Sequence, residues 1–383
     1  MAQNTVFSQV VKLIPRSLFQ SWVSKHDGDK GVRTLDCWTW FGSLLFGQLS
    51  GHDSIRALQR VFSQDDVHIR RLGFQPICKS TLADANRTRP LQILEEAFFY
   101  ALHRARTALP RKAGFKFQGE VFALDSTTIE LCLALCPWAR FHHNKGAAKL
   151  HTAINLAGDL PQFAVLTDGR VHDVTVAKRL QFAPNSTVVF DQAYVDYGFL
   201  NDLNQHGVFF VTRMKSNCQF KVRESRETNR TRGQMCDQVI WLKSLRGQRY
   251  QGKLRRISYN DPDTGKRLTF FTNRFDLATQ TICDLYKARW KVELFFRTLK
   301  QHLKIKKFLG TSVNAVKAQV LVALIAYLLV QMIRHAVKGT ISIPETMAVL
   351  ATMLLLKQPI MRLLGHLPRT TRYPPDRQGV LPF

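Results

Sequence analysis

The chain has 383 residues, of which 45% are hydrophobic and 10% aromatic, so it can bury a sizeable core and exceeds one average domain. Lys and Arg number 55 against 28 Asp and Glu, which gives a formal net charge of +27 at pH 7. A positive charge of this size attracts polyanions, so nucleic acid is favoured as the partner over a membrane surface or an acidic protein. The remaining alternative is an enzyme that is basic for no special reason.

Three further features restrict the class of protein. Seven cysteines include no CxxC pair, and Cys132 and Cys136 lack a second pair or a His at zinc spacing, which favours free thiols in a reducing compartment. The N-terminus lacks the uninterrupted apolar stretch of a signal peptide. The longest apolar run, residues 318–333, is shorter than the roughly 20 residues that span a bilayer, so it predicts a buried helix. We therefore expect a cytoplasmic, nucleoid-associated protein.

The first 115 residues predict a helical region. Residues 7–23 have helical spacing, residues 38–49 are apolar and aromatic, and a helix restarts after Pro90 over residues 91–109. Basic side chains gather near this last helix, namely Lys79, Arg87, Arg89, Arg104, Arg106, Arg111 and Lys112. A small unit that binds DNA ends fits this pattern, and an ordinary helical cap with a solvated basic face fits it nearly as well.

From Gly119 onward the pattern changes to one of strands interspersed with helices. The predicted order is three strands, a short helix, a strand, a helix and a strand, at residues 120–131, 149–158, 161–173, 174–180, 186–194, 197–207 and 207–215. This order is that of an RNase H-like sheet. The predicted fold class is therefore α+β, with an RNase H-like catalytic core whose mixed β-sheet is flanked by helices.

A mainly β insertion is predicted for residues 212–275, since apolar and polar residues alternate there. Between Val211 and Arg256 the chain has thirteen Lys and Arg against three Asp and Glu, its densest basic stretch. Helices follow at residues 278–303, 313–338 and 344–364, before a loosely ordered tail that is rich in Pro and Arg. The predicted parts are a helical N-terminal region that binds DNA ends (1–115), the catalytic core (116–211 and 276–340), the β insertion (212–275), and a C-terminal helix with a basic tail as a candidate dimerisation segment (341–383).

Two aspartates stand where a charge is costly. Asp125 lies within the strand sequence FALDSTT, and Asp191 ends the apolar strand TVVFD. A carboxylate in such a place is expensive unless it binds a metal or pairs with a base. Phosphodiester chemistry on DNA commonly uses two divalent ions, and Mg²⁺ prefers such hard oxygen ligands. For each Asp alone, helix capping is the more common explanation, but the two on neighbouring strands predict a metal site.

A third acid lies within the predicted helix at residues 278–303. Tyr286, Arg289, Glu293 and Lys300 follow one another at gaps of 3, 4 and 7 residues, which places all four on one face of a helix. This face would suit DNA phosphates, with a metal ligand at its centre. The alternative is an ordinary Arg–Glu pair on a solvated helix.

The spacing Y-x2-R-x3-E-x6-K, together with ALDSTT and VVFDQAY, resembles the insertion-sequence-four family of bacterial DDE transposases, which carry the YREK signature. The resemblance covers roughly residues 115–335. It implies a cut-and-paste DNA transposase that cleaves at the inverted-repeat ends of a transposon and joins them to target DNA. Asp125, Asp191 and Glu293 would be the catalytic residues and would hold two Mg²⁺ ions, for which Mn²⁺ would substitute. It also implies a homodimer in a synaptic complex on double-stranded DNA, without a membrane or a small-molecule substrate.

The same resemblance implies a set of residues that contact DNA. Tyr286, Arg289 and Lys300 would grip phosphates beside the cleaved bond, and Arg297 lies on the same helix. The segment FFVTRMK is similar to a family strand whose basic residues touch DNA, which adds Arg213 and Lys215. Some relatives stack a flipped base on a Trp of the β insertion while forming a DNA hairpin, and Trp241 suits this role. A core Trp in the sheet is an equally good explanation of Trp241.

Other clusters carry weaker signals. FHHNKGAAKLH gathers His142, His143, Lys145, Lys149 and His151, but no Cys or acid completes a zinc site, so a basic segment that faces DNA is preferred. The remaining acids in this part of the chain, Asp168 and Asp173, suggest a turn and a helix cap. No triad order or glycine elbow supports Ser126 as a nucleophile.

Two rival functions remain. The first is an RNase H-like endonuclease or Holliday-junction enzyme that hydrolyses DNA without joining it. The second is a domesticated DNA-binding protein without catalytic activity. A long distance between Asp125 or Asp191 and Glu293 in the fold would favour the second rival.

Overall fold

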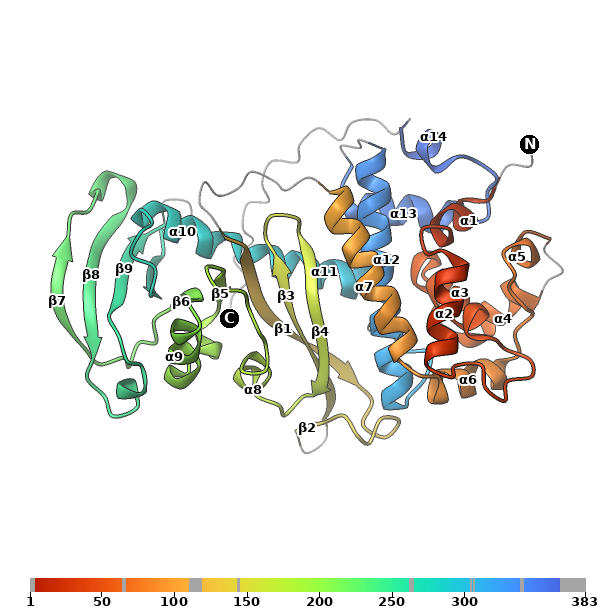
Figure 1. Cartoon of the computed structure of the whole chain (residues 1–383), viewed down its shortest axis with the longest axis horizontal. Coiled ribbons are helices and arrows are strands. Elements are labelled where there is room, and N and C mark those ends of the chain that lie inside the picture. Colours follow the sequence, from red (N-terminus) through yellow and green to blue (C-terminus); the bar gives the residue numbers. More distant parts are fainter. Residues whose placement is uncertain are drawn as a thin grey trace. The chain divides into compact units, whose positions relative to one another are not determined.

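The computed structural model describes residues 4–63, 67–109, 119–142, 145–261, 265–303, 305, 307–337 and 341–365. The chain divides into two compact units, a helical unit formed by Met1–Leu109 with Thr298–Phe383 and a strand-rich unit formed by Pro110–Arg297 (Figure 1). The division into four parts stays a prediction. Arg111, Lys112 and the tail from His366 lie outside the described residues.

The described part of the helical unit contains no strand. Its helices are α1 (Val6–Val11), α2 (Arg16–Lys25), α3 (Cys37–Ser50), α4 (Ile55–Ser63), α5 (Val67–Arg71), α6 (Lys79–Thr88), α7 (Gln92–Ala108), α12 (Val313–Ala336), α13 (Ile343–Met353) and α14 (Ile360–Gly365). The single helix predicted over residues 7–23 is two helices. Pro15 is the N-cap of the second, because it has no backbone N–H to donate within a continuing helix.

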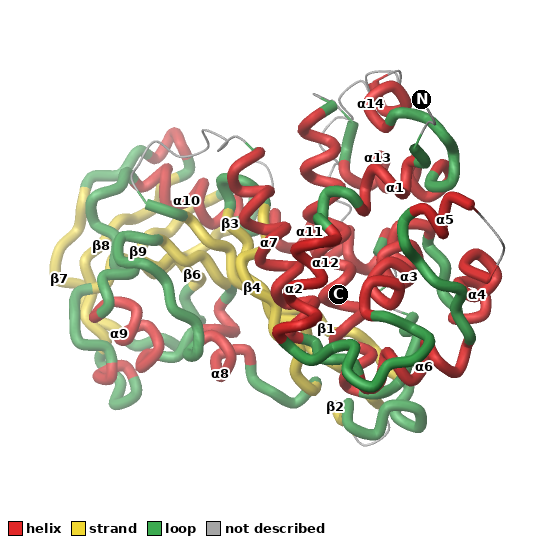
Figure 2. Tube along the Cα trace, turned by 45° about the vertical axis from the view of Figure 1, so that its right-hand side comes forward, coloured by secondary structure: helices red, strands yellow, loops and turns green. Residues whose placement is uncertain are grey.

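Helix α12 forms the core of this unit and lies beside α7 and α3 (Figures 1 and 2). Its length and apolar composition would allow it to cross a membrane, but 89% of its most apolar window is buried inside the protein. Its buried polar side chains are satisfied, since the Gln319 side chain accepts from the Leu309 N–H and donates to the Lys307 carbonyl. The predicted buried helix at residues 318–333 therefore lies within α12.

One mixed sheet organises the strand-rich unit, with ten strands within the described residues. The strands are β1 (Val121–Leu131), β2 (Arg140–His142), β3 (Lys145–Asn155), β4 (Leu160–Asp168), β5 (Thr187–Phe190), β6 (Phe209–Arg213), β7 (Phe220–Arg226), β8 (Gln234–Leu242), β9 (Leu254–Asn260) and β10 (Arg267–Thr272). They follow the order β2-β3-β1-β5-β6-β10-β9-β8-β7, and β4 pairs with β3. A mixed α+β fold, as predicted, is thus observed.

The centre of the sheet brings the two aspartates together. Strand β1 runs antiparallel to β3 and parallel to β5, with Leu124 opposite Phe190. Asp125 and Asp191 are the next residues along these two parallel strands. They therefore lie beside each other where the pairing of β1 with β5 ends. Because side chains alternate along a strand, Asp125 points away from the face that Leu124 shares with Phe190.

Helices cover both faces of this sheet. Helix α9 (Tyr197–Gln205) packs on the face of Phe190 and Phe210, in a buried aromatic cluster. Helix α10 (Thr279–Ala288) packs on the opposite face, where the rings of Tyr286 and Phe270 lie 4.8 Å apart. Helix α8 (Asp173–Ala177) and the short helices η1 (Gln192–Tyr194), η2 (Arg230–Arg232) and η3 (Gly247–Arg249) complete the connections.

Residues 212–275 continue the central sheet. Strand β10 pairs antiparallel with β6, and β9, β8 and β7 follow outward in turn (Figure 1). Strand β7 exposes Lys221 and Arg223 at the outer edge, where charged side chains hinder pairing with a further strand.

The helix predicted over residues 278–303 is interrupted. It ends as α10 at Ala288 and restarts as α11 (Trp290–His302), with Arg289 between them. The Arg289 N–H donates to the Tyr286 carbonyl at 3.1 Å, a three-residue bond that tightens the chain locally. Arg289 nevertheless keeps right-handed helical backbone angles, and Tyr286, Arg289 and Glu293 meet at one site, as their spacing predicts.

Phe210→Ala is expected to lower the free energy of unfolding by about 3–5 kcal/mol, because it opens a cavity in the aromatic cluster beside Phe190 and Tyr250. Chemical denaturation followed by circular dichroism measures this loss. Met235→Ala, at a side chain that is 40% exposed in the same unit, is the control. Equal effects of the two substitutions would show that Phe210 is not part of a close-packed core.

Candidate active site

Three acidic side chains converge in the middle of the sheet, where the pairing of β1 with β5 ends. Asp125 comes from β1, Asp191 follows β5, and Glu293 lies in the first turn of α11. Arg289 donates from Nη1 to Asp125 Oδ2 at 3.1 Å and from Nη2 to Glu293 Oε1 at 2.7 Å. The Tyr286 hydroxyl lies 3.5 Å from Asp191 Oδ2. Residues from distant parts of the sequence thus form one connected polar site.

The ionisation of Asp125 shows that these acids influence one another. The pKa of Asp125 is raised to about 6, mainly by burial, with smaller contributions from the negative charges of Glu293 and Asp191. The Ser126 N–H, which donates to Asp125 Oδ1 at 2.8 Å, and the Arg289 guanidinium oppose this rise in pKa. Three like charges held this close would repel one another, so the site needs positive charge.

Arg289 supplies positive charge in the structure. Its side chain is only 13% exposed, and its guanidinium bridges Asp125 and Glu293. Burial would lower the pKa of Arg289, but Tyr286 and the two carboxylates outweigh it and raise that pKa. The guanidinium therefore stays charged and offsets part of the repulsion between the acids.

The chemistry of the donor set fits a divalent metal ion. Asp125, Asp191 and Glu293 offer hard carboxylate oxygens, which Mg²⁺ and similar ions prefer. Among the described residues, however, no three His, Cys, Asp or Glu side chains are grouped tightly enough to hold an ion as they stand. Since Arg289 bonds to two of the acids, it contributes to their present spacing.

The other residues predicted to contact DNA are distributed along both units. Arg213 ends β6 and acts electrostatically on Tyr286, so it lies near the acids. Lys215 follows it and donates to the Val195 carbonyl at 3.0 Å. Arg297 is exposed on α11, and Lys300, further along the same helix, belongs to the helical unit.

Trp241 lies on β8, opposite Lys221 of β7. Its side chain is 41% exposed, so the explanation of Trp241 as a core residue is wrong. An exposed indole ring offers a face on which a base could stack.

The prediction that Lys149 and His151 face DNA is also wrong. Lys149 Nζ donates to the Val171 carbonyl at 3.0 Å and lies 3.4 Å from Asp173 Oδ1. The His151 side chain is 1% exposed, with Nδ1 3.4 Å from the same oxygen. His143 lies outside the described residues, and of the side chains of His142 and Lys145 nothing is described.

Sequence reasoning missed the role of Asp173. This residue looked like a helix cap, and it does lie in the first turn of α8. In the structure Asp173 Oδ1 accepts a 2.7 Å hydrogen bond from the Ser126 hydroxyl, directly beside Asp125. An acid before a short helix is common in sequences, so nothing in the sequence signalled this contact.

Stability is expected to fall faster between pH 6.5 and pH 4 in the natural chain than in His151→Gln. Burial lowers the pKa of His151 to about 4, against the opposing charge of Asp173. As the pH falls below 6.5 the unfolded chain binds the proton first, so the contribution is intact above 6.5 and lost toward 4. The expected difference is on the order of 2–3 kcal/mol at the acid end.

Denaturant titrations of both proteins across this pH range measure that difference. Contributions from Asp125 and the other carboxylates cancel in the comparison. Parallel curves for the two proteins would contradict a buried, neutral His151.

A family model described as "Transposase DDE domain" matches residues 116–329, which is more than half of the chain. The chain belongs to this family of transposases. A second model, described as "Domain of unknown function (DUF4372)", matches residues 2–75. Membership of the DDE family implies dependence on a divalent metal ion, which agrees with the carboxylates of the site.

Three bacterial relatives have names that describe them as transposases. "Putative transposase y4zB" of Sinorhizobium fredii is 34% identical over 254 residues, covering 65% of this chain and 70% of the relative. "Probable transposase for insertion sequence element IS5377" of Geobacillus stearothermophilus is 30% identical, covering 66% of each chain. "Putative transposase for insertion sequence element IS4SA" of Synechocystis is 24% identical, covering 66% of this chain and 71% of the relative.

Among solved structures, the piggyBac transposase synaptic complex with hairpin DNA is similar, with a TM-score of 0.48 and 14% identity. The match covers 95% of this chain and 82% of that one.

Proposed function

We propose that the protein is a cut-and-paste DNA transposase of the insertion-sequence-four family, built on an RNase H-like core. It cleaves DNA at the inverted-repeat ends of its element and joins the freed ends to target DNA. The observation that carries this proposal is the convergence of Asp125, Asp191 and Glu293 around Tyr286 and Arg289 in a chain of the DDE family.

In this proposal the three acids are the catalytic residues and hold two Mg²⁺ ions, with Mn²⁺ as an alternative. When bound, two such ions would supply Lewis-acid activation of the attacking water or 3′-hydroxyl and charge stabilisation for the leaving oxygen. Asp125 and Asp191 are held by adjacent strands, and Glu293 comes from a helix, so rigid elements position the oxygens. Such preorganisation limits the rearrangement that catalysis needs.

Arg289 has two tasks in this proposal. It offsets the charges of Asp125 and Glu293 in the structure described here. When other positive charge lies at the acids, Arg289 is no longer needed to offset them. Its planar guanidinium is then available to a DNA phosphate, which it can bind through two parallel hydrogen bonds. Tyr286 and Lys300 are proposed to bind neighbouring phosphates, and Arg213, Lys215 and Arg297 to extend this contact.

Double-stranded DNA is the proposed partner, both as transposon ends and as target. The formal charge of +27 supports this, because phosphate contacts dominate the affinity of proteins for DNA. We further propose that two copies hold two ends in one synaptic complex in the bacterial cytoplasm, at the nucleoid. Trp241 is proposed to stack on an unpaired base, for which its exposure is suited.

The test uses purified full-length protein and a labelled duplex that carries the terminal inverted repeat of the element. Cleavage at the repeat boundary and a joined product are expected with Mg²⁺ and not with EDTA. A duplex with a scrambled repeat is the control. Cleavage without joining would support the endonuclease instead, and saturated binding without either reaction would support the silent DNA-binding protein.

A further inference from the structure

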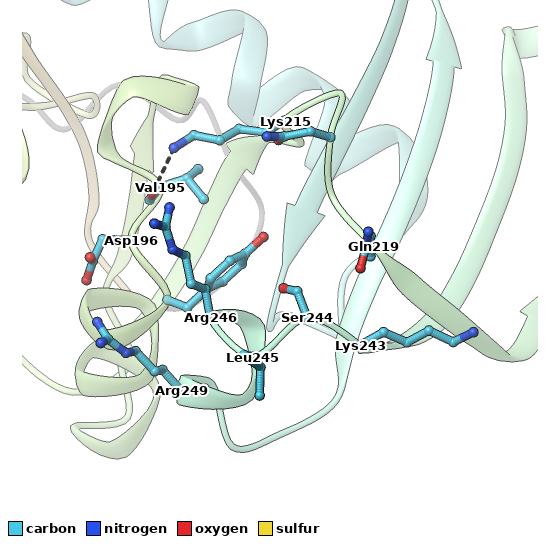
Figure 3. Close-up of a pocket in the computed structure, with 11 residues that line it drawn as sticks. Val195, Asp196, Lys215, Gln219, Lys243, Ser244, Leu245, Arg246 and Arg249 are labelled. Atoms are coloured by element: carbon cyan, nitrogen blue, oxygen red, sulfur yellow. Dashed lines mark hydrogen bonds between the residues drawn. The ribbon is translucent and has the colours of Figure 1, made fainter.

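The strand-rich unit contains a pocket in which the proposed function uses only one residue, Lys215. Its volume is about 840 Å³, and three segments line it, namely residues 195–197 after η1, residues 215–219 between β6 and β7, and residues 243–249 after β8 (Figure 3). Pockets of roughly 300–1,000 Å³ hold small organic molecules, so one or two nucleotides match this size.

The lining of the pocket is strongly positive. Lys215, Lys243, Arg246 and Arg249 contribute four cationic groups, against the single carboxylate of Asp196. Asp196 is already engaged, since it lies 3.0 Å from Lys178 Nζ and accepts from the Phe199 N–H at 2.9 Å. The positive charges therefore exceed what the lining itself can neutralise.

Two of these cations are exposed and uncommitted. Among the described residues, no hydrogen bond or ion pair engages Lys243 Nζ or the Arg246 guanidinium, and Figure 3 shows both side chains on the segment after β8. Arg249, also exposed, acts on Asp196 through its charge alone. Figure 3 shows Arg246 extending toward Lys215 and Lys243 extending in the opposite direction, so these cations would bind phosphates at separate positions along a strand.

The uncharged lining suits the rest of a nucleotide. Asn217 and Gln219 carry amides that both donate and accept hydrogen bonds, as the edge of an unpaired base requires. Leu245 is 85% exposed at the pocket, so its apolar side chain is available to a base or sugar. A pocket for phosphate alone would need neither amides nor an exposed leucine.

The segment after β8 is held firmly in place. Tyr250 is buried against Phe210, and the Gln251 N–H donates to Asn201 Oδ1 at 2.9 Å. Gly247 permits the close turn, because a Cβ there would lie 2.7 Å from the Cβ of Leu242. The cations are thus presented on a preformed support, which lowers the cost of binding.

Two of the segments that line the pocket come shortly after residues of the acid site along the chain. The first segment begins four residues after Asp191, and Lys215 lies two residues beyond Arg213. Lys215 joins the two segments by its hydrogen bond to the Val195 carbonyl, which Figure 3 shows as a dashed line. The first segment that lines the pocket therefore begins one short turn beyond Asp191.

We propose that this pocket binds an unpaired segment of a single DNA strand next to the cleaved end. Lys243, Arg246 and Arg249 bind its phosphates, while Asn217 and Gln219 contact its bases. This inference rests on the proposed function, since it assigns a subsite to the same DNA substrate.

The test measures binding of the full chain to a fluorescent single-stranded oligonucleotide and to a duplex of unrelated sequence, without metal, over a range of salt. The pocket variant is Lys243→Gln/Arg246→Gln/Arg249→Gln. The matched control is Lys221→Gln/Arg223→Gln/Lys253→Gln, which removes the same charge from exposed residues outside the pocket.

The pocket variant is expected to bind the single strand at least tenfold more weakly, with a logarithmic salt slope smaller by about 2, since each contact with a single-strand phosphate contributes about 0.7. The control is expected to lose less than threefold. Duplex binding should fall equally in both variants. Equal losses of single-strand binding in the two variants would overturn the proposal.

A second measurement separates recognition of bases from attraction to phosphates. Asn217→Ala/Gln219→Ala is expected to weaken binding of the oligonucleotide about tenfold and to leave an abasic strand of equal length unchanged. Equal loss for both strands would overturn the assigned base contacts. Cleavage of repeat-end DNA by the natural protein tests the proposed function separately, so the two hypotheses can fail independently.

Discussion

Glu293→Gln is expected to abolish cleavage and joining of transposon ends, with rates at least about a thousandfold lower, while the protein still binds DNA. The substitution keeps the shape of the side chain and removes one carboxylate charge from the acid site. Metal-assisted displacement contributes several kcal/mol to transition-state stabilisation, and each 1.36 kcal/mol corresponds to tenfold in rate. Single-turnover assays on a labelled repeat-end duplex measure both steps.

The site geometry gives a sharp control for this experiment. Glu130 lies on β1, the strand of Asp125, five residues further along, and it is exposed. Glu130→Gln removes the same charge and is expected to leave both rates within a few fold. Asp125→Asn and Asp191→Asn should behave as Glu293→Gln does. Residual activity of Glu293→Gln near that of Glu130→Gln would exclude Glu293 from the reaction.

Asp237→Ala is expected to lower the free energy of unfolding by about 3–5 kcal/mol, because it leaves a buried charge without its partner. Asp237 and Arg255 have side chains that are 2% and 3% exposed. Arg255 donates from Nε to Asp237 Oδ1 at 2.9 Å and from Nη2 to Oδ2 at 2.5 Å. Denaturant unfolding measures the loss.

This ion pair also connects the outer strands to the helix that leads to the site. Thr279, at the start of α10, donates to Asp237 Oδ2 at 2.8 Å, and Arg255 donates to the Leu277 carbonyl at 2.6 Å. Helix α10 ends near Arg289, so loss of the pair is expected to reduce cleavage as well as stability. The exposed pair of Lys25 and Glu96 provides the contrast, and Glu96→Ala should change stability little.

The double variant Asp237→Leu/Arg255→Met separates a buried charge from general damage. Removing both charges is expected to recover part of the stability that Asp237→Ala loses, since no unpaired ion remains. If the double variant were less stable than Asp237→Ala, the cost would lie in packing and not in the unpaired charge of Arg255.

Much of the acid site could be predicted from local sequence. Asp125 and Asp191 each follow apolar residues of a strand, and parallel neighbours place such residues at one edge. The position of Glu293 beside them follows from long-range packing of α10 and α11 on the sheet. No local spacing encodes that packing, so the family resemblance carried the prediction of the third acid.

Other features could not be predicted because they depend on tertiary contacts. Helical spacing places Arg289 beside Glu293, but it gives no information on the hydrogen bond from Arg289 to Asp125, which lies on a distant strand. Lys149 and His151 were predicted to face DNA, but in the structure both lie against Asp173, which comes later in the chain. The basic pocket combines three separate segments, two of which lie in the basic stretch between Val211 and Arg256, and their meeting depends on tertiary contacts.

The most direct test of the central claim is the binding of Mn²⁺ to the full chain, followed by electron paramagnetic resonance. Mn²⁺ stands in for Mg²⁺, and the measurement requires no catalysis. The natural protein is expected to bind Mn²⁺, and Asp191→Asn and Glu293→Gln to bind it at least tenfold more weakly, with Glu130→Gln unchanged. Equal Mn²⁺ affinity in all four proteins would contradict a metal site formed by Asp125, Asp191 and Glu293.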